Sequence, residues 1–387
     1  MENIGKNSKL RNRIISFLLR YPDFFYKYIH TYFPFSDEFL SKYRDVVNWP
    51  IISYNSSLIN NWDFIEKYKD VLDWETITME HLNWNEYYVD KYIDKIVWKP
   101  ELIKIGPDDY YRIDTFAANP AFNWDLNTID KYKSLIFWKD LSKNESDFWD
   151  TSILEKYRNF LNWSELSHNH SVPVNTELLE KYRDKWNWEI VLSNTHLCSQ
   201  QEAIEKYQGK LSWYTICQNN KGLINDAFIK KWHHFIHWRS IASNESYTNS
   251  HERFVQHLDK WYLHNCFIPL SGNHKLPWSI QFIEEYINDW DWEMLSLNEG
   301  LPWSVDFINI FEDKLSFGKT EPISSYESII GLGIRDLINF PWSIDILERY
   351  EHKWDFNGFV QNKSLWEKAF KPYVDQEMVD LIFKILQ

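Results

Sequence analysis

The sequence predicts an all-α fold, a solenoid or superhelix of about twelve short two-helix repeats with a cap at each end. Three observations predict it. Aromatic residues recur at a near-constant interval of 25 residues. Helix-capping side chains recur at one fixed point of that period, and the segments between them carry apolar residues at helical spacing.

The period is read from one aromatic residue in each copy, which we call the marker. The markers are Trp49, Trp74, Trp98, Trp138, Trp163, Trp188, Trp213, Trp238, Phe267, Trp292, Phe317 and Phe356. Most steps between them are 25 residues, and a second aromatic ring lies six residues before every marker. A stacked array of this kind grows without enlarging a single core, so the length of 387 residues does not require several globular domains.

The unit at 278–303 shows how each copy is expected to fold. Its first helix starts after Ser279, a residue that can accept hydrogen bonds from free backbone N–H groups, and its second starts at Trp292. Phe282, Ile283 and Tyr286 lie on one face of the first helix. Helices this short are marginal alone, so each copy must stack on its neighbours.

Capping residues recur at the start of the first helix in most copies. We expect this role for Asp63, Asn85, Asp125, Asp150, Asn175, Ser279, Ser304 and Ser343. Side chains of this type at one point of a period favour the helical interpretation.

Three regions follow from the pattern: an N-terminal cap at 1–36, the tandem Trp-rich repeats at 37–366, and a C-terminal cap helix at 367–387. The basic start of the chain is only faintly like a signal peptide, because the apolar run Ile14–Leu19 is too short. An alternative is that this basic arm binds a membrane surface.

The composition limits the partners. A net charge of −14 argues against a nucleic acid and favours a basic protein partner. Three cysteines without a CxxC pair fit a reducing compartment, so we expect a cytoplasmic protein that does not enter membranes. The oligomeric state is left open.

Two copies are longer than the rest, through insertions near 101–120 and 318–340. Insertions in repeat proteins map to loops on one face, and Tyr and Arg are enriched in binding hot spots. The candidate partner contacts are Tyr110, Tyr111, Arg112 and Tyr326. The alternative is an extra helical turn that fills a local gap.

No motif indicates catalysis, a cofactor or a metal. Phosphate loops and nucleophile elbows are absent from the sequence. His233 and His237 have the i, i+4 spacing of metal ligands, but they match no metal-binding pattern and we expect them to face solvent.

An asparagine follows the marker by six residues in nine of twelve copies. The nine are Asn55, Asn144, Asn169, Asn194, Asn219, Asn244, Asn273, Asn298 and Asn362. Such a ladder could line a ligand groove. We favour a structural role in which each amide satisfies backbone groups of its own turn and of a neighbouring repeat.

The segments LSLNEGLPWS at 295–304 and LEKYRDKWNW at 179–188 carry a family resemblance. They are similar to uncharacterised tandem Trp-rich helical repeat proteins with a period near 25 residues. In organisation the chain also resembles the tetratricopeptide and Sel1-like solenoids, without their signature residues. The resemblance implies a helical repeat fold and no particular activity.

The sequence therefore predicts a non-catalytic protein-binding or scaffold protein, such as an inhibitor or neutralising partner of a basic protein. Two alternatives stay open. One is a binder of small ligands or glycans through exposed aromatic rings, which depends on whether any tryptophan faces solvent. The other is an enzyme whose site is assembled from distant repeats.

Overall fold

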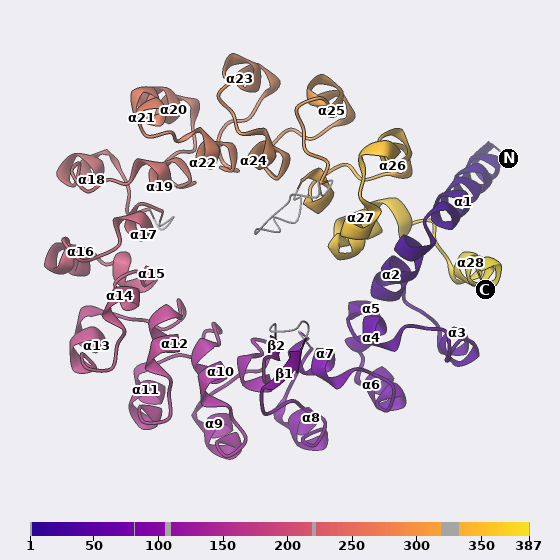
Figure 1. The fold of residues 1–387 in the computed structure, drawn as a ribbon, viewed down its shortest axis with the longest axis horizontal. Coiled ribbons are helices and arrows are strands. Elements are labelled where there is room, and N and C mark those ends of the chain that lie inside the picture. Colours follow the sequence, from indigo (N-terminus) through magenta and orange to yellow (C-terminus); the bar gives the residue numbers. More distant parts are fainter. Residues whose placement is uncertain (1, 81, 105–109, 219–221, 319–332, 387) are drawn as a thin grey trace. The chain divides into compact units, whose positions relative to one another are not determined.

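The computed structural model describes residues 2–80, 82–104, 110–218, 222–318 and 333–386. Within these ranges the protein is all-α apart from one two-stranded hairpin. The chain forms two compact units. Figure 1 labels the helices and strands that they contain. Unit 1 comprises Met1–Ile51, Ile224–Lys230 and Ile236–Gln387, and unit 2 comprises Ile52–Leu223 and Lys231–Phe235.

Unit 2 contains thirteen short α-helices, one 3-10 helix and the hairpin among its described residues. They are α5 (Ser56–Ile59), α6 (Trp62–Tyr68), α7 (Trp74–Met79), α8 (Glu86–Lys91), β1 (Glu101–Lys104), β2 (Tyr110–Ile113), η1 (Phe116–Ala118), α9 (Leu126–Tyr132), α10 (Trp138–Lys143), α11 (Thr151–Tyr157), α12 (Trp163–His168), α13 (Thr176–Lys181), α14 (Trp188–Val191), α15 (Thr195–Cys198), α16 (Gln201–Tyr207) and α17 (Trp213–Gln218).

Unit 1 contains the helices of both chain ends. They are α1 (Glu2–Arg20), α2 (Pro22–Tyr32), α3 (Asp37–Lys42), α4 (Trp49–Ile52), α18 (Asp226–Lys231), α19 (Trp238–Ala242), α20 (His251–Gln256), α21 (Leu258–Leu263), α22 (Phe267–Ser271), α23 (Ile280–Glu285), α24 (Trp292–Ser296), α25 (Val305–Phe311), η2 (Ile334–Asp336), α26 (Ile344–Arg349), η3 (Glu351–Lys353), η4 (Phe356–Gln361), α27 (Lys363–Leu365), η5 (Trp366–Phe370) and α28 (Gln376–Leu386). The last residues of α4 and α18 belong to unit 2.

The first helix of each copy, here called the A helix, starts where a side-chain oxygen caps it. Seven of the eight expected caps accept a backbone N–H in this way: Asn85, Asp125, Asp150, Asn175, Ser279, Ser304 and Ser343. The expectation for Asp63 is wrong. Asn61 caps α6, and its side chain accepts the N–H of Asp63, because this helix starts two residues earlier than the tryptophan rule implies.

The second helix, called the B helix, starts at the marker in most copies. In seven copies the marker is a tryptophan whose indole N–H donates to the carbonyl five residues earlier, as from Trp163 to Arg158 at 2.9 Å. This bond fixes the connection between the A and B helices. Four residues after the marker, Ser167 donates to the carbonyl of Trp163 at 2.7 Å and accepts the N–H of Asn187 in the next copy at 3.0 Å.

The tryptophans are packing residues. All 22 fall in the described residues, and each is buried or half-buried. Trp124 and Trp261 are among the largest fully buried side chains. The tryptophans that set the period in the sequence therefore contribute to the packed interior.

The asparagines of the ladder form hydrogen bonds with backbone groups of their own turn and of the preceding copy. Asn169, 2% exposed, donates to the carbonyls of Ser142 and Asn144 in the preceding copy at 3.0 and 2.8 Å. Its side-chain oxygen accepts the N–H of Ser171 at 2.8 Å. Each of the following asparagines likewise bonds two carbonyls of the preceding copy: Asn144, Asn273, Asn298 and Asn362. Asn219 lies outside the described residues.

Neighbouring A helices are joined by a second repeated contact, which we call the Lys–Tyr–acid triad. In α9, Lys131 and the Tyr132 hydroxyl both bond Asp90 of α8, at 2.8 and 2.9 Å. The bond from Lys131 lowers the pKa of Asp90. The same triad joins Lys156 and Tyr157 to Asp130.

The two ends of the chain meet inside unit 1. α1 packs against α28, and α2 packs against η4. Three arginines of α1 pair with carboxylates near the other end: Arg11 with Asp375, Arg13 with Asp345 and Glu348, and Arg20 with Glu351. The regions at 1–36 and 367–387 therefore pack on each other.

Candidate functional site

The first insertion folds as a hairpin, and its two strands are the only strand pair among the described residues. Its strands β1 and β2 pair antiparallel, with Glu101 opposite Ile113 and Lys104 opposite Tyr110. The 3-10 helix η1 follows and returns the chain to the repeat. The alternative of an extra helical turn accounts only for η1. Of the candidate contacts, Tyr110, Tyr111 and Arg112 lie in β2.

Arg112 anchors this hairpin to the scaffold. Its guanidinium pairs with Asp114 and with Asp140, and it lies 5.4 Å from the ring centroid of Phe137. Asp140 is fully buried in α10 and also accepts the N–H of Thr115 at 2.9 Å. A buried carboxylate needs such partners, so this pair fixes where the hairpin sits. Asp140 was missed at the sequence level because its partner lies 28 residues away.

An acidic cavity of about 240 Å³ borders the hairpin. The described residues that line it are Tyr54, Asp73, Glu75, Thr76, Met79, Glu80, Ile113 and Asp114. Four of these eight carry carboxylates and none is basic. The negative potential of such a cavity attracts a cationic side chain, while Tyr54 and Met79 can contact its aliphatic part.

The asparagine ladder continues through the copy that contains the hairpin. Asn119, at the end of the insertion, is fully buried and donates to the carbonyls of Thr78 and Glu80 at 2.6 and 3.1 Å. Its own carbonyl accepts Asn144 at 3.0 Å. The long copy therefore keeps the ladder residue but places it after the inserted strands, which is why counting six residues from the marker did not find it.

The second insertion is described only at its ends, and Tyr326 lies outside the described residues. In the described part, Arg335 is 2% exposed and lies 3.3 Å from Asp355 and 3.6 Å from Asp336. A Cβ atom at Gly358 would stand 2.1 Å from the Arg335 guanidinium, so any larger residue there would displace this side chain. Each insertion thus holds an inward-turned arginine paired with aspartate.

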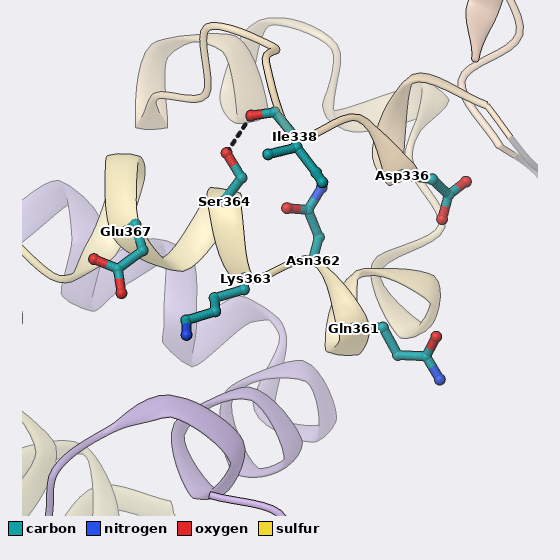
Figure 2. A pocket seen from close by; sticks show the side chains of 7 residues that line it. All are labelled: Asp336, Ile338, Gln361, Asn362, Lys363, Ser364 and Glu367. Carbon is teal, nitrogen blue, oxygen red and sulfur yellow. Dashed lines mark hydrogen bonds between the residues drawn. The ribbon is translucent and has the colours of Figure 1, made fainter. Parts of the chain in front are cut away.

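A larger cavity of about 590 Å³ lies beside the second insertion (Figure 2). Its lining side chains are Asp336, Ile338, Gln361, Asn362, Lys363, Ser364 and Glu367. Asn362 and Ser364 are engaged with backbone carbonyls of the preceding segment. Ile338 is 67% exposed at the edge of this cavity, and it is the apolar lining residue that sequence reasoning missed.

The histidines of the run at 232–238 differ in their surroundings. His233 is exposed as expected, whereas His237 is half-buried and caps α19, with its ring accepting the N–H of Ser240 at 3.3 Å. In the described part of the chain no three His, Cys, Asp or Glu side chains are grouped to hold a metal ion. The three cysteines are buried free thiols, and burial raises the pKa of Cys198 to about 12.

The basic start of the chain is engaged by the protein itself. Arg11 and Arg13 lie in α1 with their guanidinium groups on carboxylates of residues 345–377. The described helices include none that is long and apolar enough to cross a bilayer.

Comparisons with known protein families, with curated proteins and with solved structures find no match. The resemblance to tandem Trp-rich repeat proteins therefore rests on the residues quoted for it, together with the all-α, Trp-rich fold.

Proposed function

We propose that this chain is a non-catalytic protein-binding scaffold, an α-solenoid of about twelve two-helix repeats, and that its partner is a basic protein. The partner contacts the surface beside the first insertion. In a cytoplasmic setting such a scaffold could neutralise or inhibit that partner.

The acidic cavity at the hairpin carries this proposal. Its lining combines four carboxylates with Tyr54 and Met79 and lacks a described basic residue. Lysine and arginine side chains have a cationic end on an apolar stem, so they match both parts of the lining. The net charge of −14 adds long-range attraction for a basic protein.

Tyr110 and Tyr111 remain the proposed partner contacts of the hairpin. Arg112 remains in the set, but its guanidinium already pairs with Asp114 and Asp140. At the second insertion, Ile338 joins Tyr326 as a proposed contact.

The alternatives have less support. Glycan binders stack sugars on exposed rings, but none of the 22 tryptophans is exposed here. Exposed tyrosines such as Tyr87, at 66%, would have to serve instead. An enzyme would need converging acid, base or nucleophile side chains, and the most regular polar residues, the asparagines, are engaged with backbone groups.

The test compares two variants with the same change of charge. In the cavity variant, Glu75→Gln and Glu80→Gln remove two charges but keep hydrogen-bonding side chains. In the control variant, Glu252→Gln and Asp306→Asn remove two charges from exposed positions in α20 and α25. Native-cell proteins captured by each form are then quantified by mass spectrometry.

We expect the wild type and the control to capture the same basic protein, and the cavity variant to lose it with unchanged thermal stability. Capture should also weaken as salt rises. Equal capture by all three forms would reject the cavity as the binding surface. Tyr110→Ser with Tyr111→Ser, which keeps Arg112 and Asn119 in place, tests the hairpin in the same assay.

A further inference from the structure

The last helix, α28, has the design of an A helix rather than of a simple cap. Asp375 caps it by accepting the N–H of Met378 at 2.8 Å, and the fully buried Met378 and Val379 precede Asp380. The same order and spacing occur in α13 with Asn175, Leu178, Leu179 and Glu180. Its capping, core and acidic positions therefore match those of a repeat.

The residues at these positions of α28 contact the N-terminal part of the chain. Asp380 accepts Lys42 at 2.6 Å and the Tyr43 hydroxyl at 2.7 Å. This is the Lys–Tyr–acid triad that joins Lys131 and Tyr132 to Asp90. α28 thus occupies the place of an A helix immediately before α3.

α2 lies where the B helix belonging to α28 would be. Phe383 of α28 packs against Phe25 and Tyr26 of α2, with ring centroids 5.7 and 5.3 Å apart. The Tyr28 hydroxyl donates to the carbonyl of Asn362 at 2.8 Å. In other copies the asparagine of the next repeat bonds that carbonyl, as Asn169 bonds Asn144. One structural repeat is therefore shared, with its A helix from residues 376–386 and its B helix from residues 22–32.

The two ends are interleaved. α1 lies between α26, which it contacts through Arg13 and Glu348, and α28, which it contacts through Arg11 and Glu377 (Figure 1). We call the surface that receives α28 the slot. Its contacting residues are Arg11, Phe25, Tyr26, Phe39, Lys42 and Tyr43.

We propose that the slot also accepts α28 from a second copy of this chain, so that two chains exchange their last helices and form a reciprocal dimer. Every slot residue belongs to residues 11–43, and the chain reaches α28 through the short connection 371–375. Exchange therefore keeps the contacts that α28 already makes, with the helix supplied by the other chain. Within one chain the local concentration of α28 is in the millimolar range, so the monomer is favoured until docking within one chain is weakened.

Charge reversal across one ion pair tests this in the full chain. Each single variant, Lys42→Asp or Asp380→Lys, places two like charges next to each other within one chain. When the two variants are mixed in mild denaturant and dialysed, reciprocal exchange restores opposite charges at both joints of a heterodimer. We expect most of the mixture to run at twice the 47.2 kDa of one chain by mass photometry. The double variant Lys42→Asp with Asp380→Lys should run as a monomer.

The proposal is wrong if the mixture keeps the mass of one chain, or if either variant alone runs at twice that mass. Disulfide capture gives a second readout that does not depend on the reversed charges. Lys42→Cys chains are mixed with Asp380→Cys chains. In the control mixture they are mixed instead with Glu177→Cys chains, whose cysteine is at an exposed site in unit 2. A 42–380 linked peptide well above the control level supports exchange, and a yield equal to the control overturns it.

Discussion

Two kinds of interface join neighbouring helices in this protein, and they differ in chemistry. Between ordinary copies, as between the turns at Asn144 and Asn169, buried amides bond backbone carbonyls. At the joint between the chain ends, Tyr28 replaces the asparagine, and arginines of α1 bond carboxylates of α26, α28 and the segments beside them. Both interfaces share the Lys–Tyr–acid triad.

Because of this difference, the two interfaces should respond differently to salt and to acid. An amide does not titrate, and its buried bonds to carbonyls are shielded from salt. The pairs at the joint are partly exposed, with Asp375 at 55% and Arg11 at 29% side-chain exposure. Partly exposed ion pairs weaken with salt and with acid. The joint should therefore open under conditions in which the ladder stays intact.

The largest expected effect is at the apolar centre of the joint. Phe383→Ala removes a fully buried ring that lies 5.1 Å from Phe39 and 5.4 Å from Tyr43, between ring centroids. We expect a loss of about 3–5 kcal/mol in the free energy of unfolding of unit 1. Leu381→Ala, on the exposed side of the same helix, should cost less than about 1 kcal/mol. Chemical denaturation of both variants measures the contrast, and equal losses would contradict the packing described here.

Asn169→Ala should have the next largest effect. It removes three hydrogen bonds and leaves two buried carbonyls and one N–H with fewer partners. A buried group without its partner costs about 1–3 kcal/mol, and we expect a total of about 3 kcal/mol. The control is Asn127→Ala, an exposed asparagine, which should change stability by less than about 0.5 kcal/mol. A ladder that served a ligand instead would tolerate both changes in the free protein.

Acidification should loosen α28 before it loosens the ladder. Hydrogen bonds from Arg11 lower the pKa of Asp375, and those from Lys384 and Lys42 lower the pKa of Asp380. Since both pKa values are lower than their ordinary 3.8, the stability these carboxylates contribute is present above pH 3.8 and is lost as the pH falls through the lowered values.

Hydrogen exchange, corrected for its intrinsic rate, measures this difference. Protection of α28 should decrease below about pH 4, whereas the N–H of Ser171, held by the Asn169 amide, should keep its protection longer. Simultaneous loss at both places would show that the two interfaces are not distinct in this respect.

The smallest expected effect separates single ion pairs from clustered ones. Lys156→Met removes one exposed pair with Asp130 and should cost less stability than Arg13→Met. Arg13→Met removes bonds to both Asp345 and Glu348 and should cost about 1 kcal/mol. High salt should reduce both costs. The two changes are compared by thermal unfolding at low and high salt, and a larger cost for Lys156 would reverse the ranking.

The sequence by itself determined the all-α class, the positions of most helix starts and the burial of the tryptophans. These features depend on local chemistry, because a cap such as Asn175 bonds the backbone three residues away. The structural role of the asparagines also followed from the sequence, since a polar residue repeated inside an apolar period must be satisfied internally. Asp63 failed as a cap because Asn61, two residues earlier, offers an equivalent side chain.

Only the tertiary structure decided the rest. The hairpin holds Arg112 on Asp140, and the ladder passes through Asn119, because inserted residues shift the register by an amount that the period does not specify. The shared repeat of α2 and α28 joins residues more than 330 positions apart, such as Tyr28 with Asn362 and Tyr43 with Asp380. Periodicity describes which residues face a neighbour, but the identity of that neighbour at the chain ends is fixed by packing in three dimensions.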